Sequence, residues 1–227
     1  MSTISRDGVH RMFNAISLSY DRANRIMTLG QDMRWRRQFK RFMPKGKSKL
    51  LDMATGTGDQ IIALLDHIDT AVGIDLAKDM LSIGKEKLRK HDHVELIYGD
   101  ALNVPFADEH FDVVTMSFGI RNVTDTMACL REMHRTLKPG GRTIILESGM
   151  TTYPFLRPLH LFYLRHILPR IGALISKHNS AYKYLNETIE SYPHGPAFEK
   201  MLREAGFSYA KANPLFFGSV YLYVADK

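Results

Sequence analysis

Residues 50–59, which read Leu-Leu-Asp-Met-Ala-Thr-Gly-Thr-Gly-Asp, constrain the fold more than any other stretch of this chain. The apolar first half predicts a buried strand, and the glycines predict a sharp turn where the backbone can approach a ligand closely. Apolar residues at helical spacing follow, so the turn opens a helix whose free N–H groups face the strand end. Ligands bind above such strand ends in open α/β sheets. We therefore expect a binding site at this turn.

A second predicted strand, residues 71–75, ends in Asp75, whose carboxylate can accept hydrogen bonds from ribose hydroxyls. Dinucleotide-binding turns carry a third glycine that lets a pyrophosphate approach, and Ile61 occupies that position here. The turn therefore favours a nucleoside without a diphosphate, such as S-adenosylmethionine. A nicotinamide oxidoreductase is disfavoured for the same reason.

Strands and helices continue to alternate along the chain. Further strands are expected at residues 94–98, 111–117 and 142–147, and helices at residues 5–19, 77–89, 124–137, 182–190 and 197–205. The polar residues Ser19, Tyr20, Asp21 and Asn24 are expected to break the first helix and start a second, short one. Repeated alternation of this kind predicts an α/β fold with a mostly parallel sheet and helices on both faces.

The domain organisation follows from local breaks in the pattern. The Met43-Pro44-Lys45-Gly46 turn separates an N-terminal helical arm, residues 1–46, from a main domain, residues 47–227. Within that domain we expect a helical lid insertion at residues 152–190, because apolar residues there are interrupted by arginines. Such a segment is too charged to span a bilayer but fits a lid over an apolar tail. A helix pair packed over the sheet is the alternative.

Positive charge is concentrated at the start of the chain. Residues 1–49 carry 12 Lys+Arg against 3 Asp+Glu, whereas the remainder carries 19 against 21. Within residues 34–42, Trp35, Phe39 and Phe42 recur at helical spacing among basic residues. A basic amphipathic helix can lie on anionic lipid or on nucleic acid. Alternatively, its aromatic side chains dock on the domain while its arginines are solvated.

Composition bounds the remaining possibilities. The single Cys129 excludes an internal disulfide and fits a reducing compartment, and its place on the apolar side of a helix predicts a packed core thiol. The first residues lack the apolar region of a signal peptide, and no uncharged run approaches the ~20 residues of a membrane span. We expect a cytoplasmic location, either free or at the inner face of the membrane. His91 and His93 have no third ligand nearby, so no metal is expected.

Further candidate site residues come directly after the predicted strands. Met80 follows Asp75 by about one helical turn, where its side chain can cover an adenine face. Asp100 can accept a hydrogen bond from an adenine amine, and Ala101 can donate its backbone N–H to a ring nitrogen. The strand at residues 111–117 delivers Ser117, followed by Arg121 and Asn122.

Taken in order, these motifs resemble those of class I S-adenosylmethionine-dependent methyltransferases. Within that superfamily, four stretches are similar to the quinone-biosynthesis C-methyltransferases that act on demethylmenaquinol and its ubiquinol counterpart. They are residues 20–24, 55–59, 117–125 and 182–189. The Phe-Gly-Ile-Arg-Asn run at residues 118–122 is the most specific of them, and the resemblance covers most of the chain.

The resemblance implies a Rossmann-like, mostly parallel seven-stranded sheet and S-adenosyl-L-methionine as the cofactor. The positions that match the family's cofactor contacts and turn glycines are Gly56, Thr57, Gly58, Asp75, Asp100, Ala101 and Ser117. This sequence departs from the family at Ala54-Thr55, at Ser148-Gly149 and over residues 218–227.

The reaction implied is methylation of a ring carbon of a reduced polyprenyl quinone. We expect Arg121 and Asn122 to hold the quinol oxygen, with Tyr20 or Tyr184 completing the hydrogen-bond network. Arginine stays charged, so it stabilises an oxyanion rather than accepting a proton, and a base or a bound water takes the proton.

The sequence also leaves alternative functions open and predicts the partners of the protein. Methylation of another small molecule or of RNA is the main alternative, although no Asn-Pro-Pro-Tyr motif for flipped bases is present. A cofactor-binding protein without catalysis is a further one. The expected partners are a polyprenyl quinol and an anionic membrane surface, without nucleic acid, and the oligomeric state is left open.

Overall fold

A computed structural model of the chain describes the backbone of residues 6–176 and 179–227 and the side chains of residues 8–172 and 184–227. In these ranges seven strands form one sheet in the order β3-β2-β1-β4-β5-β7-β6. The strands are β1 (Ser48–Met53), β2 (Ile68–Asp75), β3 (Val94–Tyr98), β4 (Phe111–Ser117), β5 (Leu137–Ser148), β6 (Tyr209–Leu215) and β7 (Val220–Asp226). Strands β1 to β5 pair in parallel, and β7 is antiparallel to β5 and β6. The predicted fold class is confirmed.

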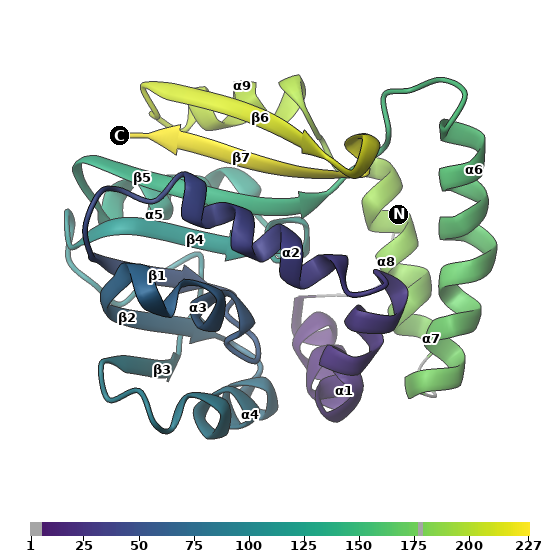
Figure 1. The fold of residues 1–227 in the computed structure, drawn as a ribbon, viewed down its shortest axis with the longest axis horizontal. Helices are drawn as coiled ribbons and strands as arrows, with labels where there is room; N and C mark the ends of the chain where they lie inside the picture. The colour runs from purple at the N-terminus through teal and green to yellow at the C-terminus, as the bar shows by residue number, and fades with distance from the viewer. Residues whose placement is uncertain (1–5, 177–178) are drawn as a thin grey trace.

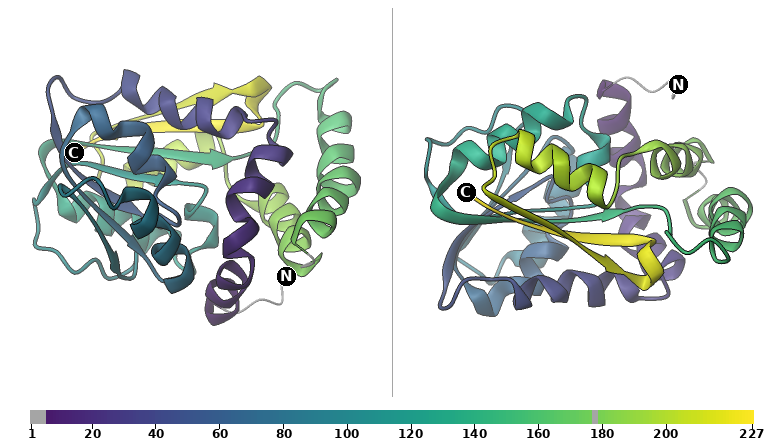
Figure 2. Two further views of the ribbon diagram at one scale, coloured as in Figure 1. Left: turned by 60° about the horizontal axis from the view of Figure 1, so that its bottom comes forward. Right: turned by 90° about the horizontal axis from the view of Figure 1, so that it is seen from above.

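Helices cover both faces of this sheet (Figures 1 and 2). One face is covered by α2 (Gln31–Arg37), η1 (Gln38–Arg41), α3 (Asp59–Leu64) and α4 (Lys78–Leu88), and the other by α5 (Thr126–Thr136) and α9 (Pro196–Glu204). Successive strand residues point to opposite faces, so Leu50 of β1 packs with the first group while Leu51 packs with the second. Cys129 is fully buried on the α5 side, as predicted for a core thiol.

The remaining long helices stand beyond the carboxyl ends of β1 and β4 (Figure 1). They are α1 (Arg6–Met27), α6 (Arg157–Phe162), the π-helical turn η4 (Tyr163–Ile167), α7 (Leu168–Ser176) and α8 (Asn179–Ser191). Helix α7 packs against α1 and α8, and the group shares a hydrophobic cluster of its own that includes Ile16 and Leu168. The segment η4, α7 and α8 therefore packs on the N-terminal arm rather than across the sheet.

The predicted break in the first helix is wrong, because α1 continues without interruption to Met27. The polar residues that suggested a break are accommodated by partners. Ser19 donates its hydroxyl proton back to the Ile16 carbonyl at 3.1 Å, and Asp21 accepts a hydrogen bond from Thr57 at 2.7 Å. Tertiary contacts thus outweigh the weak local preference of these residues against a helix.

The basic segment of the arm docks its aromatic side onto the main domain. Phe39 is fully buried among residues of α3 and α4, and Trp35 packs with its ring centroid 6.4 Å from that of Phe118. Arg34, Arg37 and Arg41 are exposed. The structure thus confirms that the aromatic side of this segment docks on the domain, and contact of its exposed arginines with anionic lipid stays a prediction.

Close packing around Gly73 gives a stability prediction. A Cβ added to this β2 residue would lie 2.5 Å from Leu96 Cδ2 and 2.8 Å from Thr55 Oγ1, and both neighbours are buried. We therefore expect Gly73→Ala to lower the free energy of unfolding by about 1–3 kcal/mol, as for other overpacked cores. Denaturant unfolding measures the change, and an unaltered midpoint would contradict the packing argument.

Candidate active site

A cleft opens where the strand order reverses, at the carboxyl ends of β1, β2 and β4, which is where open α/β sheets bind ligands. We call it the glycine-turn cleft. Its walls come from the turn after β1, the ends of β2, β3 and β4, and helix α1. Its lining includes Val9, His10, Phe13, Tyr20, Gly56, Asp75, Met80, Gly99, Asp100, Ala101, Leu102, Ser117, Phe118 and Asn122.

The turn after β1 brings its backbone to the tip of β2. Gly56 has a φ of 56°, and no atom lies within 4 Å of the place where a Cβ would stand, so a ligand has access to the backbone. Its N–H donates to Asp75 Oδ2 at 2.8 Å, and Ala77 N–H donates to Oδ1 at 2.8 Å. Burial raises the pKa of Asp75, and these two hydrogen bonds act in the opposite direction. The carboxylate is therefore fixed in place with acceptor capacity left for a ligand.

Four further residues that were predicted to contact the cofactor line the cleft. Met80 is buried and lines the cleft, and so do Asp100 and Ala101. Asp100 Oδ1 accepts from the Leu102 N–H at 2.9 Å, which orients the carboxylate. Ser117, at the end of β4, donates its hydroxyl proton to Gln60 Oε1 at 2.8 Å. These four predicted residues are brought together.

Thr57 and Gly58, also predicted to contact the cofactor, do not line the cleft. The Thr57 hydroxyl donates to Asp21 Oδ1 at 2.7 Å and accepts from Lys87 Nζ at 2.9 Å. A Cβ on Gly58 would lie 2.7 Å from Leu88 Cδ1, so this glycine allows α4 to pack closely on the turn. The Thr57 hydroxyl and the close packing at Gly58 therefore hold the turn in place, and a contact of either residue with the cofactor stays a prediction.

A charge network that the sequence analysis missed ties α1 to the glycine turn. Lys87 forms ion pairs with Asp21 of α1 and with Asp59, which follows the turn. Arg25 of α1 forms ion pairs with Asp59 at 2.7 Å and with Asp32. Although burial acts to raise the pKa of Asp59, the hydrogen bonds from Lys87 and Arg25 hold it below its usual value. The arm is thus anchored to the turn as a fixed wall of the cleft.

A second hollow, of about 600 Å³, lies between α1, the helices of residues 157–191 and the tip of the β6–β7 hairpin. We call it the apolar cavity. Its lining includes Met12, Ile16, Met27, Leu29, Trp35, Leu156, Leu159, His160, Tyr163, Leu164, Leu168, Tyr184, Leu185, Ile189, Phe216 and Phe217. The cavity and the cleft share Phe13, Tyr20, Phe118 and Asn122, so the two hollows adjoin at these residues.

Arg121 and Asn122 bring polar groups to the apolar cavity from η3 (Ile120–Asn122), just past the tip of β4. Arg121 forms an ion pair with Glu147 at the end of β5, and their side chains are 6% and 1% exposed. Asn122 Nδ2 donates to the Phe118 carbonyl at 3.1 Å. Two buried polar atoms, Arg121 Nε and Asn122 Oδ1, have no hydrogen-bond partner among the described residues. Since buried polar groups are normally paired, they mark a place for a polar ligand atom.

The two predicted tyrosines also line the apolar cavity. Tyr20 of α1 lies where the two hollows adjoin, and Tyr184 of α8 lines the cavity alone. Burial raises the pKa of both phenols, while the positive charge of Arg121 acts to lower it. Both therefore stay protonated near neutral pH and can donate hydrogen bonds.

Several functional positions could not be found from the motifs alone. Glu147 carried a usable signal, because it ends a parallel strand at the same sheet edge as Asp75 and Ser117. The residues Val9 and Phe13 lie in a segment for which the sequence predicted a helix and no part in a site. No group of three potential metal ligands occurs among the described residues, and no helix in the described part of the chain is long and apolar enough to cross a membrane.

Residues 1–227 match the model of the ubiE/COQ5 methyltransferase family. A demethylmenaquinone methyltransferase of Geobacillus kaustophilus is 37% identical over a 233-residue alignment that covers all of both chains. The enzyme of the same name from Alkalihalophilus pseudofirmus is 38% identical, over 94% of this chain and 93% of that one. One from Staphylococcus aureus is 38% identical, over 89% of this chain and 86% of that one.

Solved structures of low sequence identity share the fold. A SAM-dependent methyltransferase from Thermotoga maritima superposes with a TM-score of 0.66 at 18% identity, covering 96% of this chain and 99% of that one. Phosphoethanolamine N-methyltransferase 2 of Haemonchus contortus, in complex with S-adenosyl-L-methionine, gives a TM-score of 0.58 at 22% identity. That match covers 78% of this chain and 37% of the other. Both likenesses concern the fold alone.

Proposed function

The chain belongs to the ubiE/COQ5 methyltransferase family and is a SAM-dependent methyltransferase of quinone biosynthesis, and we propose that it methylates a ring carbon of demethylmenaquinol. One observation carries the choice of substrate: a cleft fit for a nucleoside adjoins a large apolar cavity. A polyprenyl quinol needs both the apolar volume for its tail and a polar anchor for its ring oxygen.

The glycine-turn cleft has the groups that S-adenosylmethionine requires. The fixed carboxylate of Asp75 would accept from the ribose hydroxyls, and the open backbone at Gly56 admits the ligand. Met80 would cover the adenine, with Asp100 and Ala101 at its polar edge. When bound, this cofactor supplies an electrophilic methyl group on a sulfonium. The protein's remaining task is to orient a carbon nucleophile beside it.

The residues at the junction would position the quinol. Its ring oxygen would accept from the unpaired Nε of Arg121, and Asn122 Oδ1 would accept from a quinol hydroxyl. Loss of the hydroxyl proton places negative charge on the oxygen and raises electron density on the adjacent ring carbon. Arg121 would stabilise this oxyanion in surroundings from which water is excluded. Tyr20 and Tyr184 would add neutral hydrogen-bond donors.

The proposal is tested by incubating the purified protein with methyl-labelled S-adenosylmethionine and demethylmenaquinol, followed by mass analysis of the ring. We expect one labelled methyl group on a ring carbon and none with the oxidised quinone, which lacks a phenolate. A label on oxygen, or no label with any reduced quinone, would refute it. The precursor of the ubiquinone pathway, assayed in parallel, decides whether the enzyme serves a second pathway.

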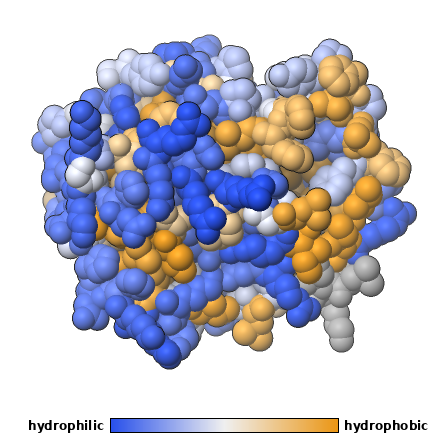
Figure 3. All heavy atoms as spheres, viewed as in Figure 1, coloured by the Kyte–Doolittle hydropathy of each residue, from blue (hydrophilic) through white to orange (hydrophobic). Residues whose placement is uncertain are grey.

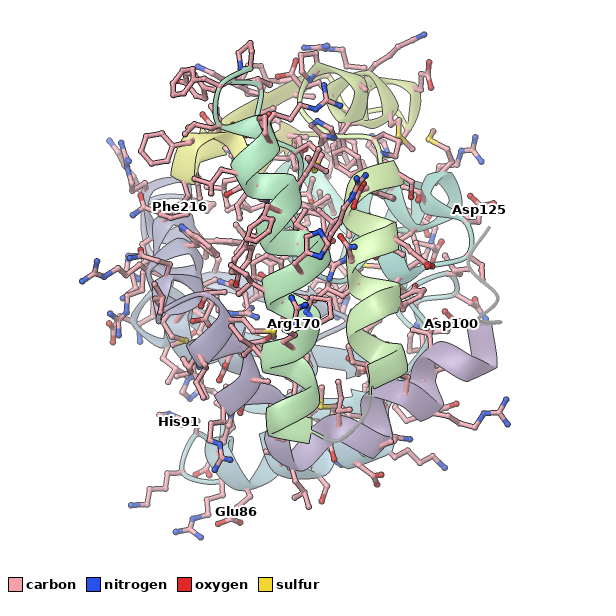
Figure 4. All side chains as sticks on the ribbon, turned by 90° about the vertical axis from the view of Figure 1, so that its right-hand side faces the viewer. Glu86, His91, Asp100, Asp125, Arg170 and Phe216 are labelled. Atoms are coloured by element: carbon pink, nitrogen blue, oxygen red, sulfur yellow. The ribbon has the colours of Figure 1, made fainter. Side chains whose placement is uncertain are left out.

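The rim of the apolar cavity supports the proposal that the protein contacts an anionic membrane. Rim side chains are exposed although they are apolar, and Figure 3 shows hydrophobic residues gathered over α6, η5 (Phe216–Gly218) and the α1–α2 turn. They are Leu29 (88% exposed), Leu159 (65%), Phe216 (57%) and Phe217 (63%). Figure 4 looks onto this side, with Phe216 beside α6 and Arg170 on α7. The exposed Arg34 and Arg157 are next in the chain to Trp35 and Leu156, which line the cavity, and arginines there complement anionic headgroups.

The double substitution Phe216→Ser and Phe217→Ser should weaken the binding of the protein to lipid vesicles. Removing two half-exposed phenyl rings from a lipid contact costs about 2 kcal/mol, or about thirtyfold in the partition coefficient. Co-sedimentation with vesicles of phosphatidylglycerol and phosphatidylcholine measures the change. Tyr209→Ser is the control, because this exposed aromatic residue lies at the other end of β6. Equal partitioning of the rim and control variants would exclude the rim as the lipid contact.

A further inference from the structure

The ion pair of Arg121 and Glu147 is buried beside the apolar cavity. Glu147 does not line the apolar cavity, whereas Arg121 does. One Glu147 carboxylate oxygen accepts from Arg121 Nη1 and from the Ser148 N–H, the latter at 2.7 Å. The other oxygen lies 3.4 Å from the Arg121 backbone nitrogen, which donates to it. Glu147 thus accepts hydrogen bonds from both the side chain and the backbone of Arg121.

These hydrogen bonds determine which nitrogens of the guanidinium can donate to a ligand. Arg121 Nη1 is occupied by Glu147 and by the Phe118 carbonyl at 3.3 Å, while Nε and Nη2 donate to no group among the described residues. A long arginine side chain has many rotamers, and holding one of them costs conformational entropy. The hydrogen bonds from Arg121 to Glu147 offset this loss of entropy in the folded protein, before any substrate binds. The donor group offered to a ligand is therefore preset.

The charge of the pair matters as much as its geometry. Arg121 Nη1 lies 3.3 Å from the carbonyl of Phe118, which lines both hollows, so a sulfonium in the cleft would lie near the guanidinium. Two positive charges in a water-poor site repel each other strongly. The Glu147 carboxylate makes the pair neutral and removes most of this repulsion. An arginine buried without it would also incur a large desolvation penalty.

We infer that Glu147 is a positioning residue that presets Arg121 for the quinol oxygen and cancels its charge toward the sulfonium of the methyl donor. The inference rests on the proposed function, because it requires the donor to occupy the glycine-turn cleft. It assigns Glu147 no contact with either reactant. Its effect on the reaction passes through Arg121.

Two nucleosides separate a charge effect from a structural one. S-adenosylmethionine carries the sulfonium charge, whereas S-adenosylhomocysteine has the same remaining groups without it. In Glu147→Gln, which keeps the size and one acceptor oxygen, we expect the affinity for S-adenosylmethionine to fall about tenfold relative to that for S-adenosylhomocysteine. A change in the structure of the cleft would lower the affinities for both nucleosides by the same factor. Calorimetric titration of each variant measures the ratio of the two dissociation constants.

Two further variants separate the effect of the Glu147 charge from its effect on the position of Arg121. Glu147→Asp keeps the charge but is one methylene too short to hold Arg121 in the same place. We expect it to keep the wild-type ratio of dissociation constants while kcat falls about tenfold or more at an unchanged donor KM. Adding Arg121→Met to Glu147→Gln removes the uncompensated cation, so the ratio should return to the wild-type value.

A matched control is available on α5. Glu132 accepts from Arg135 at 2.7 Å in a more exposed ion pair, and neither residue lines the cleft or the cavity. Glu132→Gln should leave the ratio of dissociation constants and kcat at their wild-type values. If it shifts the ratio as Glu147→Gln does, the effect is not specific to the site and the inference is wrong.

The outcomes are distinct from those of the proposed function. If the wild type binds neither nucleoside, the proposed donor site is wrong. If it binds both, and Glu147→Gln binds them in the wild-type ratio, the charge-cancelling role of Glu147 is overturned. Should Glu147→Gln not fold, the double variant with Arg121→Met must fold, because it buries no unpaired cation. Failure of both variants to fold would also overturn that role.

Discussion

Arg121→Ala is expected to lower the turnover number about a hundredfold or more, the scale of a lost oxyanion donor, while S-adenosylmethionine affinity stays nearly unchanged. The guanidinium lines the apolar cavity and its Nε is unpaired, so its loss removes the group that would meet the quinol oxygen. Arg121 does not line the glycine-turn cleft, so the methyl donor loses no contact. Burial raises the pKa of Glu147, and without the opposing effect of Arg121 this carboxyl takes up a proton, so the variant leaves no net charge toward the donor. Steady-state kinetics with demethylmenaquinol and calorimetry with the donor measure the two effects separately.

The substitution has a structural side effect that the experiment must allow for. Without Arg121, Glu147 is left buried and unpaired, which commonly costs about 3–5 kcal/mol of stability. Turnover is therefore compared well below the unfolding midpoint of the variant. Arg131→Ala, on the exposed side of α5, is the control for removing an arginine. Wild-type turnover in a folded Arg121→Ala protein would remove this residue from the mechanism.

Asp75→Ala is expected to raise the dissociation constant for S-adenosylmethionine about a hundredfold or more, because each hydrogen bond to a charged group contributes about 1.5–3 kcal/mol. The carboxylate would hold the two ribose hydroxyls, and it also fixes the glycine turn through the Gly56 N–H. Its removal therefore loses ligand contacts and loosens the backbone that the ligand approaches. Calorimetric titration measures the change in affinity.

The matched control is Asp69→Ala, at the opposite and exposed end of the same strand. It changes the net charge equally and should leave the dissociation constant unaltered. A variant of Asp75 that binds the donor as tightly as the wild type would show that the nucleoside does not occupy this cleft.

The order of strands and helices was predictable because their signals are local. The buried strand at residues 50–53, the glycine turn and the carboxylate of Asp75 each follow from a few adjacent residues. Parallel strands must place their carboxyl ends at one edge, so Asp75, Asp100 and Ser117 were expected to converge, and they line one cleft. Their roles in binding a ligand stay predictions.

The errors occurred where long-range contacts outweigh local preference. The polar residues near Asp21 were predicted to interrupt the first helix, but Thr57 and Lys87, far along the chain, provide partners that let α1 continue. The hydroxyl of Thr57 forms this contact with Asp21, whereas its predicted contact with the cofactor stays a prediction. A sequence pattern does not contain such pairings.

The sequence by itself determined the sheet, the glycine turn with its acidic partner and the run that carries Arg121, because hydrophobic periodicity and turn chemistry act between near neighbours. Only the tertiary structure decided that α1 forms a wall common to the cleft and the cavity, that the helices after β5 enclose apolar space, and that Glu147 pairs with Arg121. Those arrangements join residues from distant parts of the chain. They arise because buried charges require partners and apolar helix faces require one another, and packing alone selects which ones meet.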